Sequence, residues 1–67
     1  MPVILSQKGD CLVRPIYVEA EADGFIYARV WGDEGDGIYL GKYKDYERAK
    51  EVIRAMFQVD YYEMPLE

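Results

Sequence analysis

The sequence predicts an α+β fold, in which a small antiparallel β-meander of about four strands is followed by one C-terminal amphipathic helix packed on one sheet face. Two observations predict this fold. Short apolar and aromatic runs separated by turn residues occupy about residues 2–43, a pattern typical of short strands. From Ala49 onward the apolar spacing changes to that of a helix. We therefore expect one domain over residues 1–67, with the meander at about 2–43, the helix at about 46–58 and a tail at 59–67.

Four segments have the composition of strands. They are residues 3–6 (VILS), 11–20 (CLVRPIYVEA), 25–31 (FIYARVW) and 38–43 (IYLGKY). Turn signals separate them, first at Gly9 and then at the Asp23-Gly24 pair. Pro15 lacks a backbone donor, so we expect its neighbourhood at a sheet edge or a bulge.

The third turn signal is the glycine-rich stretch GDEGDG, residues 32–37. A calcium loop needs acids at alternate positions, whereas Asp33, Glu34 and Asp36 are irregularly spaced. A dinucleotide-binding loop opens a helix, whereas a strand follows here, and three carboxylates would repel a phosphate. We interpret the stretch as a hairpin turn in which glycines adopt positive φ.

The predicted helix has a cap and an apolar stripe. Asp45 is a suitable N-cap, and Glu47 adds negative charge to the first turn. The stripe consists of Ala49, Val52, Ile53, Met56 and Phe57. The opposite face is charged, and its spacing predicts the ion pairs Glu47–Lys50 and Glu51–Arg54.

Composition limits the classes of function. A chain of 67 residues buries a small core, and Cys11, its single cysteine, cannot form an internal disulfide, so self-association is the ordinary supplement to stability. The net charge of −5 argues against direct nucleic-acid binding and is compatible with a basic protein partner or with solubility alone. We find neither a membrane-spanning apolar run nor a signal peptide, and expect a cytoplasmic protein that does not bind membranes.

The sequence offers little for catalysis. It has no histidine, no threonine and a single serine, Ser6, so the usual triads cannot be assembled. Cys11 could serve as a nucleophile beside a basic residue, but we favour a small buried hydrophobe. We expect a protein that is not an enzyme and that uses neither a metal nor another cofactor.

Strand alternation predicts a binding surface. Ile26, Ala28 and Val30 share one face of their strand, which we expect to pack under the helix. The opposite parity predicts an aromatic face, whose candidate binding residues are Tyr17, Phe25, Tyr27, Arg29, Trp31, Tyr39 and Tyr43. Tyr, Trp and Arg are enriched at binding hot spots, and exposed apolar patches mark interaction sites. The alternative is that a coiled sheet or the tail covers these rings.

The tail, residues 59–67, combines Tyr61 and Tyr62 with several acids. We favour a frayed helix end whose tyrosines fold back onto the domain. The alternative is a segment that docks on a basic partner.

Three stretches also resemble a known group. The segments ILSQKGD (4–10), LGKY (40–43) and ERAKEV (47–52) resemble short, uncharacterised proteins of Gram-positive bacteria and their phages, with an I-S-Q-x-G-D start, then L-G-x-Y and an E-R-A-K-E-V helix. In the middle, PIYVEAEADG (15–24) departs from the polar connection typical of that group. The resemblance implies no activity and no functional residues. It does imply phage-associated roles, such as inhibition of host defence.

These observations predict a small, acidic, non-enzymatic binding protein that forms a homo-oligomer. Through the aromatic face or a cleft between subunits, it would sequester a small nucleotide-type ligand or block a host protein. In the nucleotide case a base would stack on the rings while Arg29, Arg14 or Lys42 binds a phosphate. The alternative is a structural module whose only task is protein–protein contact.

Overall fold

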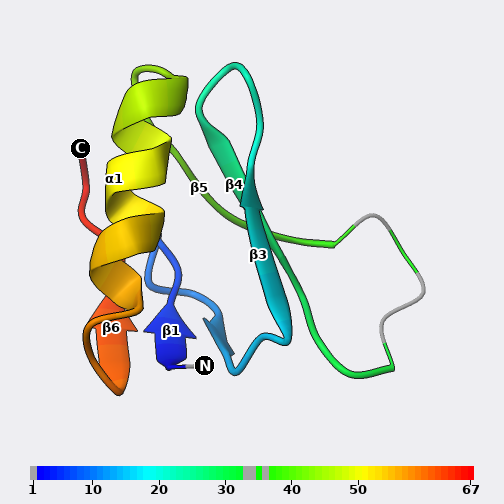
Figure 1. Cartoon of the computed structure of the whole chain (residues 1–67). Helices are drawn as coiled ribbons and strands as arrows, with labels where there is room; N and C mark the ends of the chain where they lie inside the picture. Colours follow the sequence, from blue (N-terminus) through cyan, green and yellow to red (C-terminus); the bar gives the residue numbers. More distant parts are fainter. Residues whose placement is uncertain (1, 33–34, 36) are drawn as a thin grey trace.

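The computed structural model describes residues 2–32, 35 and 37–67, and in these ranges it contains two three-stranded sheets and one helix (Figure 1). The elements are β1 (Val3–Leu5), β2 (Leu12–Val13), β3 (Tyr17–Ala20), β4 (Phe25–Arg29), β5 (Ile38–Lys42), α1 (Tyr46–Met56) and β6 (Tyr61–Glu63). The α+β class is therefore confirmed. The prediction of a single meander is wrong, because the strands divide between the sheets β2-β1-β6 and β3-β4-β5.

The β3-β4-β5 sheet is antiparallel throughout. Gly24 closes the first hairpin with φ of 96°, and its N–H donates to the carbonyl of Glu21 at 3.0 Å. A Cβ at Gly24 would collide with the carbonyl oxygen of Tyr43, so the turn also needs glycine for close approach. The second hairpin joins β4 to β5 across the glycine-rich stretch. Asp33, Glu34 and Asp36 of that stretch lie outside the described residues.

The predicted strand over residues 11–20 is broken in two. Pro15 is buried between β2 and β3, and these two short strands belong to different sheets. Because proline fixes φ and has no N–H, the chain leaves one sheet there and enters the other. The N–H of Ile16 then donates to the carbonyl of Arg29 at 2.8 Å and starts the second sheet.

The segment expected as a tail contains the sixth strand. β6 pairs in parallel with β1, with Val3 opposite Tyr61 and Leu5 opposite Glu63. A parallel pair needs a long crossover, and the hairpins and α1 between these strands provide one. Non-local pairing of this kind leaves no local signal in the sequence.

A β-bulge in β5 changes which side chains face the core. Ile26 pairs with Gly41 and Tyr27 pairs with Tyr39, so Leu40 is an extra residue in β5. Leu40 and Gly41 are both buried, and the alternation is shifted by one residue from there to the end of the strand.

Helix α1 begins at the predicted cap. The backbone N–H of Arg48 donates to the Asp45 carboxylate at 2.8 Å. The predicted Glu47–Lys50 ion pair is present at 2.8 Å, whereas Glu51 pairs with Arg48 at 3.5 Å. The helix ends at Met56, so Phe57 of the predicted stripe lies outside it and is exposed.

The core lies where both sheets meet α1, which packs against β3 and β4. Its buried side chains are Ile4, Val13, Ile26, Ala28, Leu40, Tyr43, Ala49, Val52, Met56 and Met64. Within the described ranges, no helix has the length and apolar content needed to cross a membrane.

Candidate binding face

In the part of the chain that the structure describes, one side of the β3-β4-β5 sheet has no helix over it. Ile26 and Ala28 of β4 are fully buried on the core side, together with Val18 and Ala20 of β3, which pack against the core. The alternate residues therefore point away from the core. We call this side the outer face, and it consists of Tyr17, Glu19, Phe25, Tyr27, Arg29, Tyr39 and Lys42.

Three rings form a cluster in the middle of the outer face. The centroids of Phe25 and Tyr27 are 6.2 Å apart with near-parallel planes, and Tyr39 lies 5.8 Å from Phe25 and 5.9 Å from Tyr27 at steeper angles. These are favourable aromatic geometries. Tyr27 and Tyr39 are also direct cross-strand partners, so strand pairing holds the rings in place.

Charged groups lie at both edges of the outer face and on its central strand. Glu19 lies on β3 and accepts a hydrogen bond from the Tyr17 hydroxyl at 3.3 Å. On β5, the ammonium of Lys42 lies 5.4 Å from the Phe25 ring centroid, a cation–π contact. On the central strand, Arg29 donates to the carbonyl of Gly35 at 2.7 Å. Glu19 therefore lies on the β3 edge, Lys42 on the β5 edge and Arg29 between them.

Five of the seven predicted site residues lie on the outer face. Trp31 shares their parity but follows the end of β4, where its side chain is 88% exposed. Tyr43 is not on this face, and its inclusion in the predicted aromatic face was wrong. The bulge at Leu40 reverses its orientation, so Tyr43 is 2% exposed in the core and Lys42 takes the outward position.

Tyr43 is held by polar groups inside the core. Its hydroxyl donates to the carbonyl of Pro65 at 2.7 Å, and the Arg48 guanidinium lies 5.7 Å from its ring centroid. Burial raises the pKa of Tyr43 from 10.0 to about 12, and the nearby Tyr62 hydroxyl adds to the rise. Burial also raises the pKa of Tyr62.

The strand of the C-terminal segment belongs to the other sheet and not to the one that carries the ring cluster. β6 extends the other sheet, and Met64 enters the core. The prediction left open that the tail covers the rings, but this segment is paired with β1 instead. Tyr17 is 48% exposed and Tyr39 38% exposed, whereas Phe25 and Tyr27 are half-buried.

Gln7 is a structural residue that sequence analysis did not single out. Its side-chain amide donates to the carbonyls of Lys42, Pro65 and Leu66 at 2.9–3.3 Å. Its amide oxygen accepts from the N–H of Lys42 at 2.9 Å, and its backbone N–H donates to the Leu40 carbonyl. We call this set of Gln7 hydrogen bonds the Gln7 clamp. It requires glycine at position 41, because a Cβ there would lie 2.8 Å from the Gln7 Cβ. Segments 4–10 and 40–43 are thus in direct contact.

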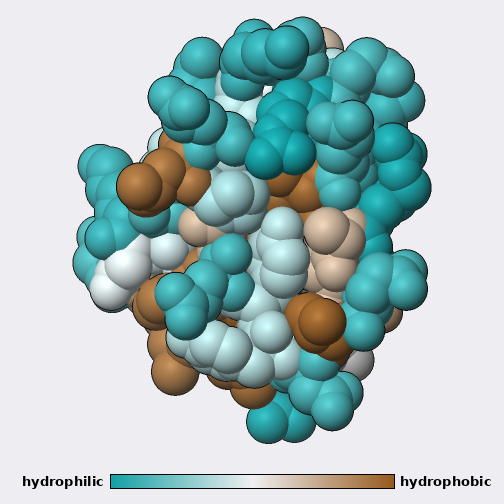
Figure 2. Space-filling model, turned by 90° about the vertical axis from the view of Figure 1, so that its left-hand side faces the viewer, coloured by the Kyte–Doolittle hydropathy of each residue, from teal (hydrophilic) through white to brown (hydrophobic). Residues whose placement is uncertain are grey.

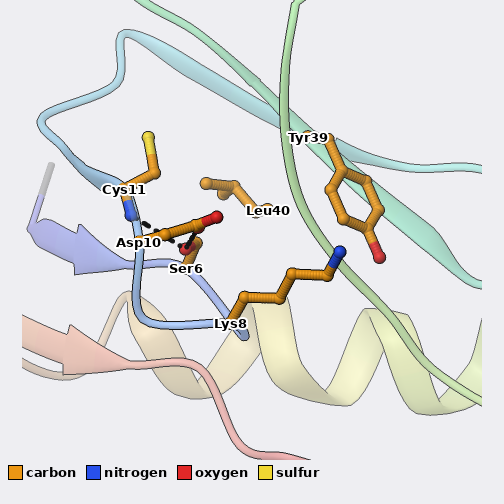
Figure 3. A pocket seen from close by; sticks show the side chains of 6 residues that line it. All are labelled: Ser6, Lys8, Asp10, Cys11, Tyr39 and Leu40. Carbon is orange, nitrogen blue, oxygen red and sulfur yellow. Dashed lines mark hydrogen bonds between the residues drawn. The ribbon is translucent and has the colours of Figure 1, made fainter.

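A cavity of about 240 Å³ lies beside this clamp (Figure 3). It is lined by Ser6, Lys8, Asp10, Cys11, Tyr39 and Leu40. The Ser6 hydroxyl donates to the Asp10 carboxylate at 3.0 Å and accepts from the Cys11 N–H at 3.2 Å. Figure 3 shows the Cys11 sulfur pointing away from this pair. Both hydrogen-bonding roles of the Ser6 hydroxyl therefore serve the turn at Gly9.

Elsewhere, the surface has a hollow beside α1 and several separate apolar patches. A hollow of about 640 Å³ between β5 and α1 contains Lys44 and Arg48, but Arg48 is already paired with Glu51 and with the Glu67 carbonyl. The side of the molecule that carries α1 and β6 shows separate apolar patches among polar residues (Figure 2). Among the described residues, no cross-strand pair of the β2-β1-β6 sheet places a basic side chain beside an apolar one.

Among residues 2–32, 35 and 37–67, no group of three or more His, Cys, Asp or Glu side chains is placed to hold a metal ion. Comparisons with models of protein families, with curated proteins and with solved structures found no match to this chain. Its function must therefore be inferred from its own residues and their geometry.

Proposed function

We propose that this chain is a non-enzymatic binding protein whose outer face docks a protein partner. The observation that carries the proposal is the ring cluster of Phe25, Tyr27 and Tyr39, which lies on the sheet face opposite to α1. Aromatic rings beside arginine, with charges around them, are the composition of a binding hot spot.

A protein partner fits the outer face better than a nucleotide does. The hollow next to Phe25 and Tyr27 is bordered by Glu21 and Asp23, and these carboxylates would repel phosphate. Of the three cations considered for a phosphate, Arg29 already donates to the Gly35 carbonyl. Arg14 follows β2 in the other sheet, which leaves Lys42 as the one of the three on the outer face whose side chain makes no hydrogen bond or ion pair among the described residues. The three rings also contact one another, which leaves no space for a base to insert between them.

Blocking of another protein and simple structural assembly would use the same residues. They differ only in the identity of the partner. A cross-linking experiment that reports the partner's mass separates them.

The test is to replace Tyr39 by the photo-crosslinking residue p-benzoylphenylalanine in cells that make the protein. Tyr39 is 38% exposed on the outer face, so the bulkier ring can be accommodated there. The matched control carries the same residue at Glu51, which is exposed on α1. We expect irradiation to give one discrete protein adduct from position 39 and none from position 51. Equal adduct patterns from both positions, or none from position 39, would contradict the proposal.

A further inference from the structure

We infer that the outer face is self-complementary and that its protein partner is a second copy of this chain, docked face to face about a twofold axis parallel to β4. This inference rests on the proposed function, because it names the occupant of the same face. Its evidence is the arrangement of charges around the ring cluster.

The outer face can be described as three columns, one for each strand. β3 and its continuation contribute Tyr17, Glu19 and Glu21, β4 contributes Arg29, Tyr27 and Phe25, and β5 contributes Tyr39 and Lys42. Glu21 belongs to this surface because its N–H bonds to the Phe25 carbonyl at 2.8 Å, and because it borders the hollow beside Phe25 and Tyr27.

Opposite charges lie at opposite edges of the same row. Phe25 is flanked by Glu21 on the β3 side and is paired with Lys42 on the β5 side. These two charges are separated by two strand spacings, or roughly 10 Å. Among the residues that the structure describes, the ion pairs do not include one between Glu21 and Lys42 of the same chain.

A twofold axis parallel to β4 brings these charges together. Such an axis places the β3 edge of one copy over the β5 edge of the other, so Glu21 faces Lys42 of the second copy, and the reverse pair forms as well. The ring clusters then lie opposite each other around the axis. Arg29 also lies near the axis and faces its own counterpart there, a like-charge contact that weakens the dimer, while its hydrogen bond to the Gly35 carbonyl holds the guanidinium toward its own chain.

The dimer should be weak. Three strands of about five residues span a footprint of roughly 14 by 17 Å, smaller than a standard protein–protein interface. We therefore expect association in the micromolar to millimolar range, which sets the concentrations for the experiment.

The decisive experiment mixes two charge-reversed variants, Glu21→Lys and Lys42→Glu. Alone, each variant places like charges at both contact points of its dimer, and we expect its association to weaken about tenfold. Mixed, they restore two opposite-charge contacts, and we expect a heterodimer that associates about as tightly as the unmodified protein. Analytical ultracentrifugation measures the association, and native mass spectrometry distinguishes the heterodimer by mass.

Matched controls reverse charges away from the outer face. Glu47→Lys and Lys50→Glu make the same charge changes on α1, and both should associate like the unmodified protein. Circular dichroism verifies that all four variants are folded. A mixture that associates no better than its components, or a loss of association in the α1 controls, would overturn the inference.

The inference and the proposed function can fail separately. An unmodified protein that stays monomeric at millimolar concentration, with an adduct of a different protein from position 39, overturns the second-copy inference and leaves the proposed function standing. Absence of any adduct at position 39 overturns both. An adduct of twice the chain mass supports both.

Discussion

At the scale of single residues, Tyr43 shows how a β-bulge, here at Leu40, changes the environment of a nearby side chain. Strand alternation predicts it beside Tyr39 on the aromatic face, yet it is buried and donates to the Pro65 carbonyl. Its hydroxyl must stay protonated there, because a phenolate would lose both hydration and the hydrogen bond it donates. Tyr43 is thus a pH-sensitive residue of the core and not a residue of the candidate binding face.

Tyr43 should make the protein sensitive to alkali. Its pKa is about 12 when folded and 10.0 by the ordinary value, so the folded chain retains a proton that the unfolded chain releases between these limits. The stability that this contributes is complete below about pH 10 and is lost as pH rises toward about 12. The raised pKa of Tyr62 acts in the same direction.

Tyr43→Phe removes this titration. We expect a loss of about 1 kcal/mol in unfolding free energy at neutral pH, from the missing hydrogen bond, and a shallower fall above about pH 10. Urea unfolding followed by circular dichroism at a series of pH values measures both effects. Equal slopes for the variant and the unmodified protein would show that Tyr43 is not responsible.

At the scale of elements, the Gln7 side chain joins segments that the sequence presents as unrelated. It links the first turn to the bulged end of β5 and to the residues after β6. Without this clamp, the end of β5 and the C-terminal segment would lose hydrogen-bonding partners that no neighbouring strand supplies.

Gln7→Ala should therefore destabilise the fold by about 1–3 kcal/mol, because several hydrogen bonds are lost together. Gln58→Ala is the matched control, since Gln58 is exposed after α1 and should change stability by less than about 0.5 kcal/mol. Urea denaturation of both variants gives the comparison. Similar losses in the two variants would refute the role assigned to Gln7.

At the scale of the whole molecule, small size gives self-association a thermodynamic role. The chain has 67 residues and one cysteine, so its core is not supplemented by an internal disulfide. A second copy on the outer face would cover the ring cluster and add apolar burial. Binding to the folded state alone raises apparent stability by mass action.

The melting temperature should therefore rise by a few degrees for each tenfold increase in protein concentration above the dissociation constant. Lys42→Glu should reduce this dependence, and Lys50→Glu should preserve it. Differential scanning calorimetry over a range of concentrations measures the effect. A melting temperature independent of concentration in the unmodified protein would argue against the dimer.

The sequence by itself determined the elements whose signals are local. The Asp45 cap and the apolar spacing placed α1, the Asp-Gly turn placed the β3–β4 hairpin, and alternation in β4 separated Ile26 and Ala28 from Phe25 and Tyr27. Five of the seven candidate binding residues lie on one face for this reason, because side-chain direction within an unbroken strand follows from residue parity.

Only the tertiary structure decided the rest. The division into two sheets at Pro15, the parallel pairing of β6 with β1, and the bulge that turns Tyr43 inward all depend on partners distant in the chain. Register and non-local pairing are selected by the packing of the whole core, where one extra residue exchanges the two faces of a strand. For that reason the sequence predicted that an aromatic face exists. Which residues belong to that face, and that its edges carry opposite charges, could be seen only in the fold.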